Sequence, residues 1–112
     1  MQYAVLIYDA PGSYESLSPD ALERVMAEYG PITQDAAVRG GAQLQPVQTA
    51  TTLRVKDGQT LTTDGPFADT KEVLGGFYLI EVEKFDQALE FAERIPSARM
   101  GGAVEVRPLV ER

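Results

Sequence analysis

The sequence contains no cysteine, no histidine and no tryptophan. Without cysteine the chain cannot form a disulfide, a thiolate nucleophile, a zinc knuckle or an iron–sulfur cluster. Without histidine it also lacks the side chain that most often serves as a general base near neutral pH. Most of the usual signatures of catalysis and metal binding are therefore missing, and the residues alone name no substrate.

Basic residues are few as well: 10 Lys and Arg stand against 17 Asp and Glu, a formal net charge of −7. Nucleic-acid binding needs clustered basic side chains that displace counterions from phosphates, so no nucleic-acid partner is expected. No apolar stretch reaches membrane-spanning length. The opening residues Met1–Asp9 lack a basic region and a cleavage site, which predicts a cytoplasmic protein that does not enter a membrane.

The residues that are present predict one domain over positions 1–112. With 44% hydrophobic and 24% charged residues the composition is close to the globular average, and the length suffices for one modest core. From Tyr3 to Tyr8 every residue is apolar or aromatic, which predicts a strand buried on both faces.

A helix is predicted to begin after Ser18, the N-cap, with Pro19 at the first helical position. Gly40–Gly41 is expected to end it. Pro31 cannot donate a backbone hydrogen bond, which predicts a kink near Gly30 or two consecutive short helices. Its apolar positions recur every three or four residues: Leu22, Val25, Met26, Tyr29, Ile32 and Ala36.

The remaining pattern predicts a short strand at Gln43–Gln45, a hairpin at Thr51–Thr63, a long strand at Gly75–Glu83, a helix at about Asp86–Ile95 and a last strand at Ala103–Val110. The second helix is expected to place four apolar residues on one side: Phe85, Ala88, Leu89 and Ala92.

Two turns fit the hairpin. A two-residue Asp57–Gly58 loop would place Leu61 opposite Arg54 and mix apolar with polar residues on each face. A three-residue loop over positions 56–58 would pair Leu53 with Leu61 and keep the faces distinct, so we expect the three-residue loop.

The order of elements, βα, ββ(β), αβ, predicts an α+β fold of the ferredoxin-like kind, an antiparallel sheet with two helices on one face. The first strand offers Tyr3, Val5 and Ile7 to one face and Ala4, Leu6 and Tyr8 to the other, and the two helices can cover only one face, which leaves the apolar side chains of the other without a cover. Burying those side chains is worth several kcal/mol at about 25 cal/mol per Å². We therefore expect an identical sheet to cover this face in a homodimer; the alternative is that the hairpin folds over it.

The stretch Asp64–Glu72, which reads DGPFADTKE, resembles the signature of the DGPF subgroup of YCII-related proteins. Five flanking segments are also similar to that family: Met1–Tyr8, Leu53–Val55 before an Asp-Gly turn, Gly75–Ile80, Ile95–Arg99 and Val104–Pro108. The resemblance implies a ferredoxin-like fold that forms a dimeric α+β barrel.

The resemblance implies less about chemistry. Some YCII relatives are thought to use a His–Asp pair, and one branch resembles an enzyme that removes chloride from a hydroxylated aromatic ring. This chain has no histidine, so that base cannot be carried over. Members that resemble the DGPF subgroup often lie beside extracytoplasmic-function sigma factors, which makes a sigma factor a candidate partner by association alone.

Candidate catalytic residues are Asp64 as general base, Lys71 as electrostatic stabiliser, and Tyr78 or Tyr8 as hydrogen-bond donor. Each has a structural interpretation as well: Asp64 can cap its turn, Lys71 can be a surface charge, and the tyrosines can be packing residues.

Glu72 and Arg99 are further candidate binding residues, although Arg99 can instead bond nearby carbonyls or Glu105. The acidic residues lack an ordered ligand spacing, so neither a metal nor a cofactor is expected. The sequence favours a dimeric small-ligand protein, an acid/base isomerase or lyase for a small carboxylate or phenolic compound. The alternative is a non-enzymatic regulatory module linked to a sigma factor.

Overall fold

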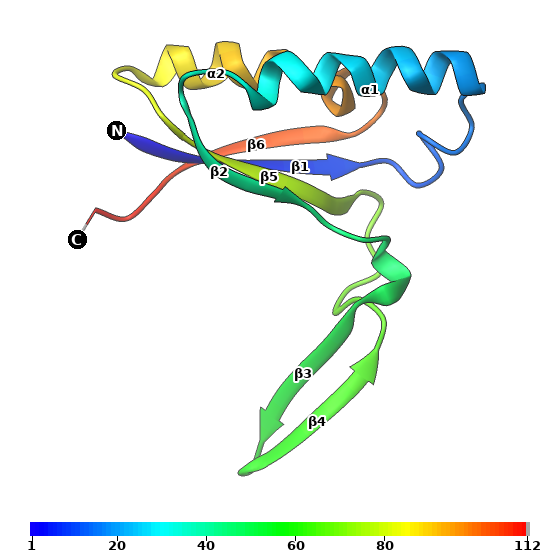
Figure 1. Cartoon of the computed structure of the whole chain (residues 1–112). Helices are drawn as coiled ribbons and strands as arrows, with labels where there is room; N and C mark the ends of the chain where they lie inside the picture. The colour runs from blue at the N-terminus through cyan, green and yellow to red at the C-terminus, as the bar shows by residue number, and fades with distance from the viewer. Residues whose placement is uncertain (112) are drawn as a thin grey trace.

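The computed structural model describes residues 1–111, and Figure 1 shows a sheet with two helices above it and a hairpin below. The elements in chain order are β1 (Gln2–Asp9), α1 (Pro19–Thr33), β2 (Val38–Gln43), the 3₁₀ helix η1 (Val47–Thr49), β3 (Thr51–Lys56), β4 (Gln59–Asp64), β5 (Val73–Glu81), α2 (Phe85–Glu93), the 3₁₀ helix η2 (Pro96–Arg99) and β6 (Ala103–Pro108).

The main sheet has the strand order β2-β5-β1-β6, and every neighbouring pair is antiparallel. Helices α1 and α2 both lie over the same face of it (Figure 1). The chain is thus an α+β protein with two helices packed on an antiparallel sheet, and this prediction from the sequence is confirmed.

Alternation along β1 separates a covered face from an open one. Tyr3, Val5 and Ile7 are buried under the helices, together with Ile80 of β5 and Ile32 of α1. The other face of the sheet, which we call the open face, carries side chains that are only half-buried: Ala4, Leu6, Tyr8, Phe77 and Leu79.

Helix α2 packs by a different stripe from the one expected. Ala88, Phe91 and Ala92 are buried, whereas Phe85 and Leu89 are exposed. Phe91 belongs to the core because it lies three residues after Ala88, and its ring meets Tyr78 edge-on at a centroid distance of 5.5 Å. Leu89 does not join the core as expected, whereas the half-exposed ring of Phe85 still lies 5.8 Å from the ring of the core residue Tyr3.

Helix α1 begins as expected, with the Ser18 hydroxyl accepting a hydrogen bond from the Ala21 backbone N–H at 3.2 Å. It runs through Pro31 as a single helix, not as two short ones, and ends at Thr33, well before Gly40–Gly41. The two glycines instead lie in β2, which spans Val38–Gln43 in place of the expected strand at Gln43–Gln45. Gly41 fits there because a Cβ would lie 2.4 Å from a backbone oxygen of β5.

Strands β3 and β4 form the hairpin that we call the arm, residues 51–64. Its loop has two residues, with Lys56 opposite Gln59, so the expected three-residue loop was wrong. Asp57 and Gly58 have φ values of 51° and 76°, the left-handed pair that a type I′ turn needs. This turn matches strand twist, and the exposed arm has no buried face that would enforce the other register.

Figure 1 shows the arm pointing away from the sheet on the side opposite the helices. It therefore does not fold over the open face, which was the alternative to a dimer. The radius of gyration is 16.0 Å, against about 13 Å expected for a compact chain of this length. The open face is left without a cover from the described part of the chain.

Candidate functional site

A hollow of about 570 Å³ lies where the arm joins the sheet, and we call it the arm-base hollow. Strand β1 supplies Tyr8 at the end of its open-face row, and the segment before β5 supplies Glu72. Most other lining residues are apolar. The full lining is Tyr8, Leu44, Gln45, Pro46, Val47, Thr49, Ala50, Pro66, Phe67, Ala68, Thr70, Glu72, Val73 and Leu74.

Local sequence explains why the walls of this hollow meet. Two strands of the arm converge at its base, where the Gly65 N–H donates to the Ala50 carbonyl at 2.7 Å. The Thr52 hydroxyl donates to the Gly65 carbonyl at 2.8 Å. Gly65 has a φ of 98°, and this left-handed turn leads the chain from β4 into the lining residues Pro66 and Phe67.

Tyr8 is positioned by an irregularity between β1 and β5. Ile7 pairs with Gly76, but Tyr8 pairs with Leu74, so Gly75 is the extra residue of a bulge. A Cβ on Gly75 would lie 2.1 Å from a carboxylate oxygen of Asp9. Glycine at this position leaves room for Asp9. The bulge lies at the start of β5, next to the lining residues Val73 and Leu74.

The Asp9 carboxylate belongs to a cluster of polar side chains that the sequence did not reveal. Ser97, which is 1% exposed, donates to Asp9 Oδ1 at 2.5 Å. The Tyr14 hydroxyl lies 2.8 Å from Ser97 Oγ and 2.9 Å from the Tyr29 hydroxyl. Burial is the main cause that raises the pKa of Tyr29 above its ordinary value.

No local motif could have disclosed this cluster, because Asp9 and Ser97 are 88 residues apart in the sequence. The three hydroxyl groups and Asp9 Oδ1 have partners within the same chain, and these bonds tie η2 and α1 to the end of β1. It supports the strand from which Tyr8 enters the hollow.

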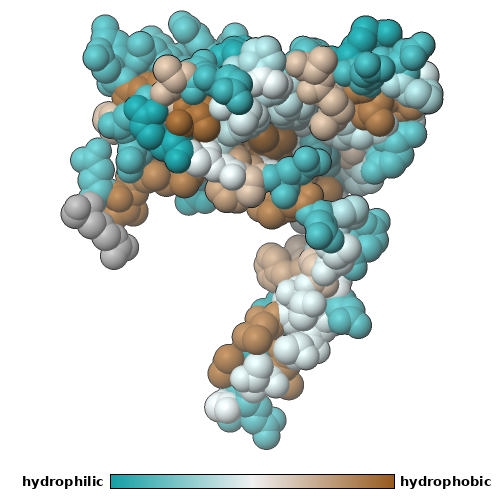
Figure 2. Space-filling model, viewed as in Figure 1, coloured by the Kyte–Doolittle hydropathy of each residue, from teal (hydrophilic) through white to brown (hydrophobic). Residues whose placement is uncertain are grey.

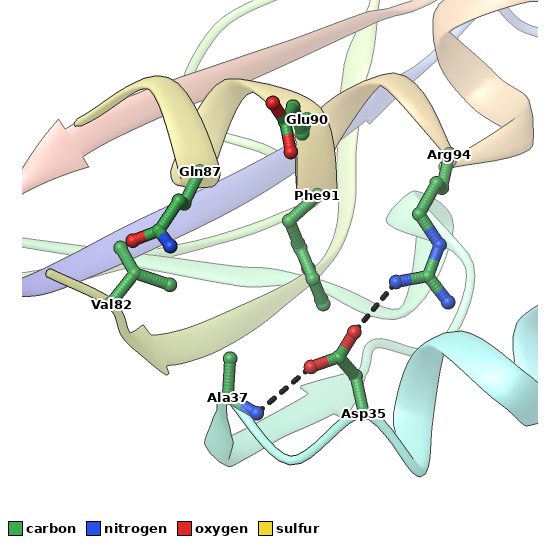
Figure 3. A pocket seen from close by; sticks show the side chains of 7 residues that line it. All are labelled: Asp35, Ala37, Val82, Gln87, Glu90, Phe91 and Arg94. Carbon is green, nitrogen blue, oxygen red and sulfur yellow. Dashed lines mark hydrogen bonds and ion pairs between the residues drawn. The ribbon is translucent and has the colours of Figure 1, made fainter. Parts of the chain in front are cut away.

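A second hollow, of about 310 Å³, lies between α2 and the start of β2 (Figure 3). The Asp35 carboxylate accepts hydrogen bonds from the Ala37 backbone N–H at 2.9 Å and from Arg94 at 2.7 Å. The Ala37 bond, followed by the Arg94 bond, lowers the pKa of Asp35 below its ordinary value. Arg94 also lies 5.9 Å from the ring centre of Phe91. Asp35 and Arg94 are thus paired with each other, as expected for a structural contact, and Glu90 is the other charged residue that lines the hollow.

The structure brings two of the sequence-predicted site residues, Tyr8 and Glu72, into one hollow. Asp64 and Lys71 are exposed and do not line it. Lys71 lies between the lining residues Thr70 and Glu72, and Asp64 precedes Gly65 by one residue. The expected convergence of Asp64, Lys71 and a tyrosine in one cleft is not found among the residues lining either hollow.

Tyr78 and Arg99 lie elsewhere. Tyr78 is on the covered face of the sheet, and its hydroxyl is 2.8 Å from the Thr33 hydroxyl. Arg99, at the end of η2, forms an ion pair with Glu28 of α1. Sequence reasoning could not assign Tyr78 because an aromatic residue in a two-faced apolar strand fits either face. It could not assign Arg99 because its partner Glu28 lies 71 residues away in the sequence.

A metal site is not evident: among residues 1–111 no group of three or more acidic side chains is arranged to hold an ion. Within the same residues no helix is long and apolar enough to cross a membrane. The polar groups that line the arm-base hollow are the phenol of Tyr8, the carboxylate of Glu72, two threonine hydroxyls and the amide of Gln45. Such a set can donate to an oxygen and accept a proton.

Comparison with known proteins assigns the chain to a family. The family model of the YCII-related domain matches residues 1–112. The chain belongs to the YCII-related family. An uncharacterized protein of Rhizobium meliloti (strain 1021) is 41% identical over 114 residues, covering 97% of this YCII-related chain and 92% of the relative.

Among solved structures, the YCII-related chain is similar to 5-chloro-2-hydroxyhydroquinone dehydrochlorinase from Burkholderia phenoliruptrix AC1100, determined in complex with 2,5-dihydroxybenzoquinone. The TM-score is 0.55 at 23% sequence identity, with 100% of this chain and 96% of the other covered. The likeness extends over the whole fold and agrees with the α+β architecture described above.

Proposed function

We propose that this YCII-related protein binds a small phenolic compound in the arm-base hollow and acts on it by proton transfer, as an isomerase or lyase. The observation that carries the proposal is that Tyr8 and Glu72 line one hollow whose other walls are mostly apolar. A volume of about 570 Å³ falls within the range of small-molecule sites. The dehydrochlorinase with the similar fold holds a dihydroxybenzoquinone, which supports the choice of ligand class.

In this proposal Glu72 is the acid/base group. Its carboxylate takes a proton from the ligand while the Tyr8 hydroxyl donates a hydrogen bond to a ligand oxygen that gains negative charge. An isomerase returns this proton from Glu72 to another atom of the ligand. In a lyase the leaving group departs with the electron pair of its bond, and Glu72 gives the proton to that group or to water. We place the base at Glu72 in preference to Asp64 because Glu72 lines the hollow and Asp64 does not.

Lys71 has a supporting role in the same proposal. Both of its neighbours, Thr70 and Glu72, line the hollow, and its exposed ammonium group can attract an anionic ligand toward the entrance. A cation held near a developing oxyanion lowers the energy of the transition state. No metal or other cofactor is required for these steps.

We further propose that the protein is a homodimer in which two open faces pack together. Leu6, Phe77 and Leu79 stay half-buried on a face that the chain's own helices and arm do not cover. Stable interfaces bury roughly 800 Å² per partner, and a four-stranded sheet face offers an area of that order. Because Tyr8 belongs to the open face, the second sheet would also wall the arm-base hollow.

Calorimetric titration with 2,5-dihydroxybenzoquinone and small benzoates tests the site. We expect binding to the native protein, with weaker binding to Tyr8→Phe and Glu72→Gln. Asp64→Asn is the matched control, because it removes one carboxylate outside the hollow. Equal affinity for all four proteins would refute ligand binding in the arm-base hollow. A loss of affinity confined to Asp64→Asn would indicate that Asp64, and not Glu72, is the carboxylate at the site.

Light scattering tests the dimer. Leu6→Glu places a charge on the open face and is expected to give monomers, whereas Leu89→Glu, at an exposed position on α2, leaves the dimer intact. A native protein that is monomeric at micromolar concentration would refute the dimer.

A further inference from the structure

The arm exposes apolar side chains that its own chain does not cover. Leu53 of β3 is 59% exposed and Val55 is 66% exposed, and every residue of β4 is exposed. An isolated two-stranded hairpin is at best marginally stable in water. Contiguous exposed apolar side chains mark interaction sites in soluble proteins, so the arm is a candidate contact surface.

The two faces of the arm differ. The register places Leu53 and Val55 on one face, together with Thr60 and Thr62 from the other strand. The opposite face carries the cationic side chains Arg54 and Lys56, with the exposed Leu61 paired to Arg54. Arg54 already has a partner in its own chain, because its guanidinium lies 5.4 Å from the ring centre of Phe67. The Leu53–Val55 face carries no charge between its tip and Thr62, and its one charged residue, Asp64, lies at the base of the arm, so the outer part of this face is suited to an apolar contact.

The direction of the arm indicates what it contacts. Figure 2 shows hydrophobic side chains along the side of the arm that faces the space beneath the sheet. The proposed dimer fills that space with the sheet of a second copy. Six-residue strands extend for about 20 Å, whereas packed sheets are about 10 Å apart. An arm that leaves one sheet at its open face is therefore long enough to pass the rim of the other.

We propose that the arm is a dimer clasp: in the homodimer its Leu53–Val55 face packs against the rim of the partner's sheet, and its Arg54–Lys56 face stays in solvent. This inference rests on the proposed dimer and adds a second contact to it. The occupant is a second copy because the hydrophobic side of the arm faces the space beneath the open face, which the second sheet of the proposed dimer would fill.

The absence of native cysteine makes a direct test possible, since one introduced thiol is the only reactive sulfhydryl. Val55→Cys and Lys56→Cys are adjacent positions on opposite faces of β3. Each variant is reacted with a charged maleimide in the native state, and the rate is divided by its rate in denaturant to remove intrinsic thiol reactivity. The same pair is then measured in a Leu6→Glu background.

In the dimer we expect Val55→Cys to react severalfold more slowly than Lys56→Cys, with the difference lost in the Leu6→Glu background. A dimer in which both thiols react equally, fast or slowly, would overturn the clasp and leave the sheet-face dimer standing. Protection of Val55→Cys that persists in Leu6→Glu monomers would trace it to the same chain and also overturn the clasp. A native monomer would refute the dimer and the clasp together.

Discussion

Ser97 donates a hydrogen bond of 2.5 Å to the Asp9 carboxylate and so joins η2 to the end of β1. Tyr14 and Tyr29 complete the cluster around the Ser97 hydroxyl. The strand end that this cluster holds is the one that presents Tyr8 to the arm-base hollow. Stability and site geometry are therefore coupled at this point of the fold.

Replacing Ser97 with alanine is expected to destabilise the protein by about 1–3 kcal/mol, because Asp9 and the two phenols lose a buried partner. Urea unfolding followed by circular dichroism measures the change. Ser16→Ala is the matched control: Ser16 is exposed, and its loss is expected to change stability by less than about 0.5 kcal/mol. Equal effects of the two substitutions would contradict a structural role for the cluster.

The raised pKa of Tyr29 predicts how the stability of the protein changes at alkaline pH. Burial raises the pKa of its phenol above the ordinary value of 10.0 in the folded state, so folding favours the neutral phenol. Its contribution is complete below pH 10 and is lost as the pH rises from that value through the folded pKa. Unfolding measured at a series of pH values above 10 should show a steeper decline for the native protein than for Tyr29→Phe. Identical declines would contradict the raised pKa.

The lowered pKa of Asp35 predicts a loss of stability at acidic pH. The Ala37 N–H and Arg94 lower its pKa below the ordinary 3.8, so its contribution is present above that value and is lost as the pH falls through the folded pKa. Asp35→Asn should flatten the acid side of the stability profile.

Arg94→Gln tests how the Asp35 effect divides between its two partners. The substitution keeps the Ala37 bond, and the exposed ion pair that it removes is worth about 0.2–1 kcal/mol. It should therefore flatten the acid profile less than Asp35→Asn does, because the backbone bond is the larger cause of the shift. A flattening as large as that of Asp35→Asn would reverse the order of the two causes.

Two glycine substitutions should differ in their effect on stability. A Cβ on Gly102 would lie 2.2 Å from the Tyr8 carbonyl oxygen, so Gly102→Ala forces the backbone apart and is expected to cost about 1–3 kcal/mol. A Cβ on Gly40 in β2 would lie 3.8 Å from Leu79, an ordinary contact, so Gly40→Ala is expected to change stability by less than about 0.5 kcal/mol. Melting temperatures of the two variants measure the contrast, and equal losses in both would refute it.

Much of the fold could be predicted from local patterns. The Ser18 cap, the strand at Tyr3–Tyr8 and the order of elements each depend on neighbouring residues, and each is present in the structure, although the chain by itself buries only one face of that strand. The failures share a cause as well. Gly40–Gly41 resembles a helix stop, but both glycines pair with β5. The three-residue loop was expected because it gives the hairpin a separate apolar face, and the exposed arm buries no such face.

The sequence by itself determined the α+β class, the family and the presence of an open apolar face, because hydrophobic periodicity and a contiguous motif are local properties. Only the tertiary structure decided that Tyr8 and Glu72 share a hollow, that Tyr78 points to the helices and that Ser97 meets Asp9. Those relationships join residues far apart in the chain. They depend on strand register, a bulge and the direction of the arm, which no short stretch of sequence encodes.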